Sequence, residues 1–268
     1  MSFYTSLSGL KNAQTSLGVI SHNIANAETA GFKKSRVEFG DIVAGSAFTN
    51  PRMIQGIGST VETISQNFAI GPIEQTGSAL DAAITGDGFF TTKDAVSGDL
   101  LFTRNGSFTT DEAGFIHDGA DNRLQIFAPG ADPATATPID AQVAATNAAG
   151  ATFAGLTIGA DGTVTASYAD GTNEELGQVA LASFTSPQGL KQVGSSNWAA
   201  TGLSGTPAYG VPGSGAYGSL LSGALERSNV DIAEELVSLI TAQRYFQANA
   251  KAIDTATQIS QTVINLRT

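Results

Sequence analysis

The two ends of this chain are patterned differently from its centre, and that contrast most constrains the fold. Residues 219–268 contain a single glycine, Gly223, although the whole sequence has 31, and the centre is rich in Gly, Ser, Thr and Asp. Glycine weakens helices and permits tight turns, so a Gly-poor end favours a helix and a Gly-rich centre favours short strands. We therefore expect an α+β fold, with long terminal helices and a central, mainly antiparallel β domain.

The first 27 residues carry apolar residues at heptad spacing, which is typical of a coiled-coil seam. We expect a helix over residues 2–27, about 39 Å long. Gly31 follows it and suits a helix exit with a positive φ. The apolar face comprises Phe3, Leu7, Leu10, Ala13, Leu17, Ile20, Ile24 and Ala27.

The C-terminal end repeats this pattern over a longer stretch. Asp231 and Glu234 are spaced as a capping pair at the start of a predicted helix over residues 231–266, about 54 Å long. The apolar residues cover more than one face, so we expect this helix to have several neighbours. One face comprises Ile232, Leu236, Leu239, Phe246, Ala250, Ile253 and Ile264, and the second comprises Val237, Ile240, Ile259, Val263 and Leu266.

Helices at opposite ends of one chain can pair as a coiled coil only if both termini come together. The simplest interpretation is an intramolecular helical hairpin. The alternative is that apolar faces left over after pairing bind further copies of the chain. In both cases the central block becomes a separate module.

The centre, from about Ile73 to Phe184, has the pattern of an antiparallel sheet. Asp-Gly pairs at 87–88, 118–119, 161–162 and 170–171 are hairpin-turn signals. Residues 163–168 alternate between polar and apolar side chains, as in a half-buried strand. Residues 128–153 show no clear periodicity, and we expect a surface excursion there. The expected segments are a helical N-terminal domain (1–40), an extended linker (41–75), a β-rich outer domain (76–218) and a helical C-terminal domain (219–268).

The composition argues against several classes of function. A formal charge of −11 repels phosphate backbones and anionic lipids, so we expect no nucleic-acid partner. There is no cysteine, and His22 and His117 are the only histidines, which leaves little for metal binding or acid–base catalysis. No run approaches the roughly 20 apolar residues of a membrane span. The N-terminus lacks a secretory signal pattern, so we expect the protein to stay inside or to leave with its N-terminus intact.

Two local motifs resemble ligand sites but lack the necessary context. Gly213, Gly215 and Gly218 spell G-x-G-x-x-G, yet Pro212 precedes them where a nucleotide site needs a strand. Close packing of a loop on backbone explains these glycines better. The carboxylates around Asp170 do not have the spacing of a calcium-binding loop. We expect no catalytic, cofactor or metal site.

Lys33, Lys34 and Arg36 form the only dense basic cluster in this acidic chain. The simplest interpretation is a solvated loop. Because the cluster follows the N-terminal helix, the alternative is a contact with an acidic surface of another copy. That contact would make assembly weaker at high salt.

Several segments resemble the flagellar hook and rod protein family. At the N-terminus these are residues 6–11, 20–26 and 29–33; in the centre, 75–77, 83–90 and 102–108; at the C-terminus, 223–231, 234–237 and 242–244. The resemblance leaves mainly residues 128–155 without a counterpart. The residues that carry the terminal motifs are Asn23, Asn26, Gly31, Phe32, Ser228, Asn229, Gln243 and Arg244.

The resemblance implies a structural protein of the bacterial flagellum and no enzyme. The short form of a hook subunit is the first interpretation: it polymerises into a helical tube that transmits torque between rod and filament and encloses the export channel. A rigid distal rod subunit is the alternative. The implied partners are further copies, neighbouring rod, hook-cap and hook–filament junction proteins, and the type III export apparatus.

Within that family the terminal helices are expected to form the inner tube by self-assembly. The residues expected to drive it are Phe3, Leu7, Leu10, Leu17, Ile20, Ile24, Ile232, Leu236, Leu239, Phe246, Ile253, Val263 and Leu266. Two other classes stay open: a secreted β-domain enzyme or carbohydrate-binding module with coiled-coil ends, and a closed homo-oligomer held by a helical bundle.

Overall fold

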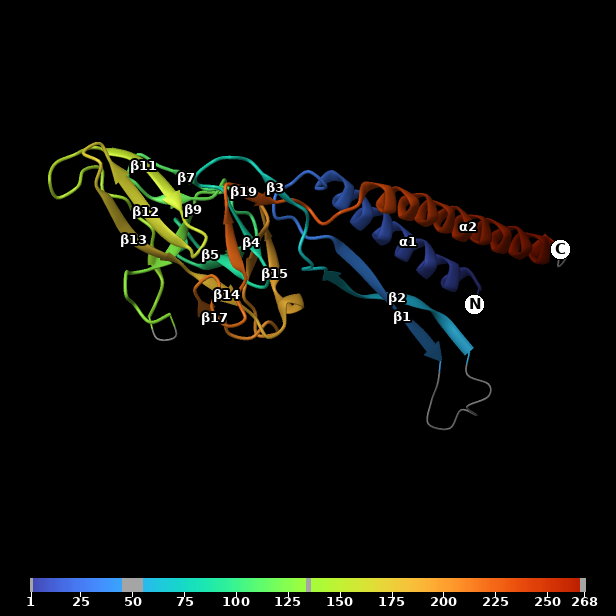
Figure 1. The fold of residues 1–268 in the computed structure, drawn as a ribbon. Helices are drawn as coiled ribbons and strands as arrows, with labels where there is room; N and C mark the ends of the chain where they lie inside the picture. The colour runs from blue at the N-terminus through green and yellow to red at the C-terminus, as the bar shows by residue number, and fades with distance from the viewer. Residues whose placement is uncertain (1, 45–54, 134–135, 266–268) are drawn as a thin grey trace. The chain divides into compact units, whose positions relative to one another are not determined.

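The computed structural model describes residues 2–44, 55–133 and 136–265 (Figure 1). The chain divides into two compact units. Unit 1 comprises Met1–Ala27, Lys34–Asn67 and Val230–Thr268, and unit 2 comprises Glu28–Lys33 and Phe68–Asn229. Unit 1 holds both long helices and a two-stranded sheet, whereas unit 2 holds the other strands.

Unit 1 is built on two helices, α1 (Ser2–Ala25) and α2 (Ile232–Asn265), which lie side by side in Figure 1. The predicted terminal helices are confirmed to within two residues at each end. Asp231 caps α2 as expected, because its Oδ1 accepts hydrogen bonds from the backbone N–H groups of Ala233 (2.8 Å) and Glu234 (3.2 Å). None of the helices within residues 2–44, 55–133 and 136–265 is long and apolar enough to cross a membrane.

The two helices run antiparallel. Asn23 Nδ2 lies 3.2 Å from Glu235 Oε2, and Gly9 faces Asn249 further along the pair. A Cβ atom at Gly9 would lie only 2.6 Å from Asn249 Oδ1, so this glycine permits the close approach of α1 to α2. Both contacts belong to one register, which places Ser2 opposite Ala256.

Strands β1 (Ser35–Ala44) and β2 (Gln55–Gln66) form an antiparallel pair that packs on α1. Asn12 Nδ2 donates to Ser59 Oγ at 2.8 Å. We expected an extended linker over residues 41–75, and the structure corrects this, because most of that segment belongs to β1, β2 and β3. At the two register shifts, after Glu38 and after Ile42, the extra residue lies in β2, at Glu62 and at Ile57, so a search for period two misses β2.

Unit 2 is a β unit in which every pair of named strands is antiparallel, as expected. Its main sheet has the order β11-β12-β13-β9-β5-β6-β16-β15, with β7, β8, β10, β14 and β17 attached beside this path. Two small sheets pair β3 with β19 and β4 with β18.

The strands of unit 2 have the following bounds: β3 (Ile73–Gln75), β4 (Ala82–Thr85), β5 (Phe89–Asp94), β6 (Leu100–Thr103), β7 (Thr109–Thr110), β8 (Ile116–His117), β9 (Asn122–Phe127), β10 (Ile139–Asp140), β11 (Phe153–Ile158), β12 (Thr163–Tyr168), β13 (Asn173–Val179), β14 (Leu181–Ser183), β15 (Lys191–Gly194), β16 (Asn197–Ala199), β17 (Ala208–Gly210), β18 (Ser219–Ser222) and β19 (Ala224–Glu226). A single 3₁₀ turn, η2, covers Pro187–Gly189. Because β18 and β19 belong to unit 2, the boundary that we expected at residue 219 is placed too early.

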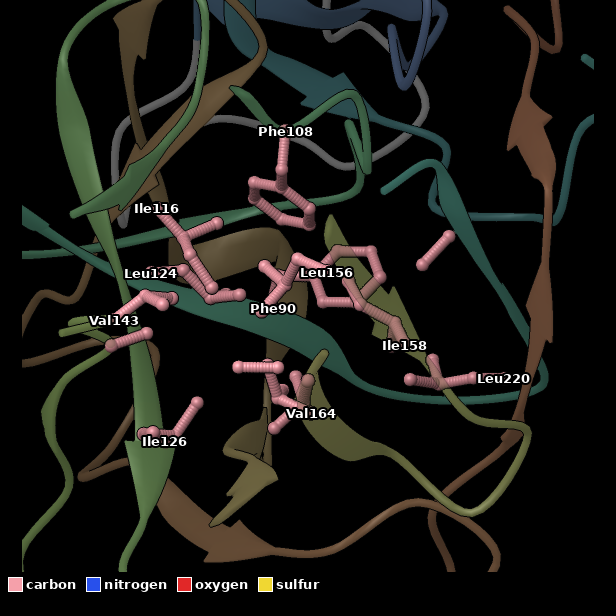
Figure 2. Close-up of a cluster of buried hydrophobic side chains, with 14 of the residues drawn as sticks. Phe90, Phe108, Ile116, Leu124, Ile126, Val143, Leu156, Ile158, Val164 and Leu220 are labelled. Carbon is pink, nitrogen blue, oxygen red and sulfur yellow. The ribbon is translucent and has the colours of Figure 1, made fainter. Parts of the chain in front are cut away.

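Alternating residues of the strands form the core of unit 2. Figure 2 shows Phe90, Phe108, Leu124 and Val164 pointing into one cluster. The Phe90 and Phe108 rings meet edge to face with centroids 5.3 Å apart. The predicted alternation of residues 163–168 is confirmed, since the apolar member of each pair is buried.

Three of the four Asp-Gly turns join paired strands. The turns at 161–162 and 170–171 connect β11 to β12 and β12 to β13, and the turn at 118–119 connects β8 to β9. The hairpin predicted at 87–88 is wrong, because β4 pairs with β18 and not with β5. Its turn residues are local, whereas the partner strand lies more than 130 positions away in the sequence.

The prediction for residues 128–153 is wrong in part, whereas the prediction for the G-x-G-x-x-G motif is confirmed. Residues 128–153 are not only a surface excursion: Ala141 and Val143 are buried in the core, and β10 pairs with β9. The expected close packing at the G-x-G-x-x-G motif is confirmed at Gly218. A Cβ atom there would lie 2.7 Å from the Cα of Gly86.

Candidate functional site

The outer face of α2 is apolar and exposed. In α2 only Glu235 and Ala242 are buried among the described residues. Eight large apolar side chains of the helix are exposed, and they form what we term the α2 apolar surface: Ile232, Leu236, Val237, Ile240, Tyr245, Ile259, Val263 and Ile264. Exposed apolar surface of this extent is typical of sites that bind another protein, a membrane or a ligand.

The last turns of α2 lie beyond the start of α1 in the register that pairs Gly9 with Asn249. From residue 257 to residue 265 every described side chain is exposed. Ile259 and Val263 are each 60% exposed, and Ile264 is 65% exposed. The apolar residues of this part of α2 are therefore exposed on every side of the helix.

The predicted assembly residues divide between the two helices. On α1, Ile20 is buried, Leu7, Leu10, Leu17 and Ile24 are half-buried, and Phe3 is exposed. On α2, Leu239, Phe246 and Ile253 are half-buried, whereas Ile232, Leu236 and Val263 are exposed. Leu266 lies outside the described residues. The α1 face is thus used mainly within unit 1, and the α2 face largely is not.

Asn23 is the buried centre of a polar cluster in unit 1, which comprises Asn23, Lys34, Ser35, Glu234 and Glu235. Asn23 is 1% exposed; its Nδ2 donates to the Ser35 carbonyl at 2.8 Å, and its Oδ1 accepts from the Ser35 N–H at 2.9 Å. These bonds tie α1 to the first residue of β1, while the 3.2 Å bond to Glu235 ties it to α2. The motif residue Asn23 therefore holds three elements together.

Lys34 completes the unit 1 cluster. Its Nζ lies 2.9 Å from Glu235 Oε1 and 3.0 Å from Glu234 Oε2. Partial burial acts to lower the pKa of Lys34, but the hydrogen bonds to Glu235 and Glu234 outweigh it, so this pKa is raised. The Glu234 carboxylate thus pairs with Lys34, the residue directly before β1.

A second buried cluster lies in unit 2 and comprises Lys33, Ala69, Gly71, Arg104 and Glu226. Lys33 Nζ lies 2.5 Å from Glu226 Oε1 and donates to the Ala69 carbonyl at 2.8 Å. Glu226 Oε1 also accepts from the Gly71 N–H at 2.8 Å, and Arg104 Nη1 lies 3.4 Å from Glu226 Oε2. Two cations share one carboxylate. Burial lowers the pKa of Lys33 despite the opposing effect of Glu226, and burial also lowers the pKa of Arg104.

These clusters correct both interpretations of the basic segment. Lys33 has no exposed surface and Lys34 pairs with two glutamates of its own unit, so neither is a solvated loop residue or a free contact for another copy. Only Arg36 of the three is exposed. The partners Glu226 and Glu235 were missed, because no local pattern connects them with residues about 200 positions earlier.

The other motif residues serve local packing or stay exposed. Gly31 has a positive φ of +67°, as expected, but it lies six residues beyond the end of α1 and is not the helix exit; its N–H donates to the Glu226 carbonyl at 2.8 Å. Phe32 and Ser228 are buried, and Asn229 Nδ2 donates to the Ala69 carbonyl at 3.0 Å. Asn26 Nδ2 donates to the His22 carbonyl at 2.9 Å, which satisfies an acceptor in the last turn of α1. Gln243 and Arg244 are exposed on α2.

Unit 2 also has an open cavity of about 710 Å³ beside β6, β15 and β16. Its lining includes Asp94, Asp99 and Lys191. Within residues 2–44, 55–133 and 136–265, no three His, Asp or Glu side chains are grouped so that they could hold a metal ion.

Comparison with protein families matches three parts of the chain. Residues 3–33 match the family described as flagella basal body rod protein, residues 83–166 match the flagellar hook protein FlgE/F/G D1 domain, and residues 221–266 match the flagellar basal body rod FlgEFG protein C-terminal region. The first and last matches contain α1 and α2, and the second lies within unit 2.

Individual relatives match over almost the whole chain. The flagellar basal-body rod protein FlgG of Bacillus subtilis (strain 168) is 38% identical over 279 residues, which cover 99% of this chain and 98% of the relative. The FlgG protein of Agrobacterium fabrum is 32% identical, with 95% of both chains covered. The flagellar hook protein FlgE of Salmonella typhimurium is 28% identical over 411 residues, with 100% of both chains covered.

These relatives are structural proteins of the flagellum and not enzymes. The matched families contain both helices with their motifs and part of the β unit between them. The chain therefore belongs to the flagellar hook and basal-body rod protein family and is part of the bacterial flagellum.

Proposed function

We propose that this chain is a subunit of the basal-body rod and that it polymerises through its terminal helices. The observation that carries the proposal is the exposed α2 apolar surface on a chain that aligns end to end with rod proteins. Such a surface is costly in water and stable once another copy covers it.

The choice of rod over hook is supported by length as well as identity. The rod relatives align with this 268-residue chain over 279 and 268 residues, whereas the hook protein needs 411. The hook protein thus has long segments that this chain lacks. We therefore place the rod interpretation ahead of the hook interpretation that the sequence alone favoured.

Within one subunit, α1 and α2 form an antiparallel coiled coil. The spacing of inward residues supports this arrangement: Ala13 and Ile20 of α1 are buried seven residues apart, and Glu235, Ala242 and Asn249 follow the same interval on α2. Heptad spacing on both helices is what a coiled-coil seam requires. The exposed residues Ile232, Leu236, Val237 and Ile240 of the α2 apolar surface lie at other heptad positions than this seam.

Between subunits, the α2 apolar surface binds further copies. A contact between two different faces, repeated by each copy, produces an open helical polymer unless it closes into a ring. Burial contributes about 25 cal/mol for each Å² of apolar surface removed from water. Such polymers make the inner tube, and unit 2 is the outer module. Neighbouring rod proteins and the type III export apparatus are the further partners we propose.

Electron microscopy of the purified, concentrated protein tests this function. The proposal expects straight tubes of constant diameter, as a rigid drive shaft needs. Curved or supercoiled tubes would favour the hook alternative, and closed particles of fixed subunit number would contradict polymerisation altogether.

A further inference from the structure

The charge of the chain is divided unequally between its two units. Unit 1 holds seven Lys or Arg and seven Asp or Glu, so its formal charge is zero. Unit 2 holds six Lys or Arg and seventeen Asp or Glu, so it carries the whole charge of −11. The unit with the apolar assembly surface is therefore neutral, and the β unit is strongly acidic.

The cations of unit 2 are mostly engaged within the unit. Lys33 and Arg104 share Glu226, and both Lys93 and Arg123 lie near Asp140. Arg227 pairs with Glu28 and with Glu74. These pairs leave Lys191 as the one cation classed as exposed among the described residues of unit 2.

Most of the charged side chains on the surface of unit 2 are carboxylates. Twelve of the seventeen belong to exposed residues: Glu28, Glu74, Asp87, Asp99, Asp111, Glu112, Asp121, Asp132, Asp161, Asp170, Glu174 and Glu175. They belong to turns and strands from Glu28 to Glu175 in the sequence, so copies whose β units approach each other bring like charges together.

We propose that unit 2 is a self-repelling surface, which other copies of this chain approach only when counterions screen it. The inference rests on the proposed polymerisation through the helices. Each copy added through the neutral unit 1 brings with it a unit 2 of charge −11, because the two units are joined directly in the chain. Polymerisation therefore gathers acidic surfaces, and salt promotes it.

The direction in which salt changes assembly distinguishes repulsion between acidic units from attraction between the basic segment and another copy. A contact between the basic segment and an acidic surface of another copy would make assembly weaker as salt rises. The structure places Lys33 and Lys34 in intramolecular pairs, so only Arg36 of the basic segment is exposed to another copy, and repulsion between units of charge −11 is the larger long-range electrostatic effect. The range of that repulsion falls from about 30 Å at 0.01 M salt to about 8 Å at 0.15 M.

The test measures the critical concentration for polymerisation of the full-length protein by sedimentation, from 0.01 to 0.15 M NaCl at pH 7. The wild-type critical concentration falls by about fivefold or more across this range, in which the Debye length shortens most.

A triple variant, Asp99→Lys with Glu112→Lys and Glu175→Lys, raises the formal charge of unit 2 from −11 to −5. All three residues are exposed, and their carboxylates form no hydrogen bond or ion pair with any residue that the structure describes. This variant polymerises at lower protein concentration in 0.01 M NaCl and responds less to salt.

The matched control keeps the charge at the same three positions, with Asp99→Glu, Glu112→Asp and Glu175→Asp. It follows the wild-type salt dependence, which excludes an effect of substitution as such. Circular dichroism of both variants verifies the fold. A wild-type critical concentration that is constant or rises with salt overturns this inference alone, as does a lysine variant with the wild-type salt response. Failure of the wild type to polymerise at any salt concentration contradicts the proposed function as well.

Discussion

Lys33 Nζ lies 2.5 Å from Glu226 Oε1, and neither side chain has any exposed surface. Lys33 ends the first segment of unit 2, and Glu226 lies three residues before the end of the second segment. The pair, with Arg104 beside it, therefore fixes the N-terminal segment of unit 2 to its C-terminal strand β19. A buried carboxylate between two cations is necessary here, because its loss would leave both cations uncompensated.

Replacing Glu226 is expected to destabilise the protein strongly. Glu226→Gln removes the carboxylate that forms ion pairs with both Lys33 and Arg104, and breaking a buried ion pair on one side costs about 3–5 kcal/mol. Urea denaturation measures the loss. The matched control is Glu74→Gln, which removes an exposed carboxylate and is expected to cost less than about 1 kcal/mol. Equal stability of the two variants would show that the buried cluster has no structural role.

Gly9 is expected to tolerate a side chain far less well than Gly18. Both glycines lie in α1, but a Cβ atom at Gly9 would collide with the Asn249 side chain, whereas a Cβ atom at Gly18 meets nothing within 4 Å. Gly9→Val should therefore separate α1 from α2 and lower the melting temperature, while Gly18→Val leaves it nearly unchanged. Thermal unfolding followed by circular dichroism compares the two variants. An identical effect at both positions would argue against the helix pairing described above.

Asp140 is expected to contribute stability that is lost in acid. Partial burial acts to raise its pKa, but hydrogen bonds from Gln125 and Arg123 and the nearby Lys93 outweigh it, so the pKa of Asp140 is lowered below its ordinary value of 3.8. A carboxylate with a lowered folded pKa stabilises the fold above pH 3.8, and the contribution disappears as the pH falls through the folded pKa.

The measurement for Asp140 is the unfolding free energy of the wild type and of Asp140→Asn between pH 2 and 6. The wild type is more stable by roughly 1 kcal/mol near pH 6, since the group is partly exposed. The difference narrows below pH 3.8. Asp99→Asn is the control for an exposed carboxylate. A difference that persists unchanged at pH 2 would mean that Asp140 acts through packing and not through its charge.

A structural feature of this molecule is predictable from the sequence when the residues that form it lie close together along the chain. The terminal helices follow from a heptad pattern and a cap at Asp231, all of which are local signals. The hairpins at 161–162 and 170–171 follow from Asp-Gly turns for the same reason. In each of these cases the information lies within one or two turns of the chain.

Features that depend on distant residues were not predictable in this way. Lys33 and Glu226 are 193 positions apart, so no local pattern showed that the lysine would be buried. Strand β4 pairs with β18, which made the turn signal at 87–88 misleading. The bulges at Glu62 and Ile57 break the alternation of β2, so its pairing with β1 was not predictable from a local pattern. Motif residues such as Asn23 were found from the resemblance, but their structural role became clear only with their partners.

The most direct test of the central claim is the polymerisation of a variant that loses only the free end of the α2 apolar surface. Ile259→Ser with Val263→Ser removes two side chains that are each 60% exposed and contribute nothing to the seam with α1. Gln258→Ser with Gln261→Ser is the matched control on the same helix. If further copies bind this surface, the first variant raises the critical concentration for tube formation about tenfold or more, since each buried side chain is worth at least ~1 kcal/mol, and the control leaves it unchanged. Tubes that form from both variants at the wild-type concentration would contradict assembly through α2.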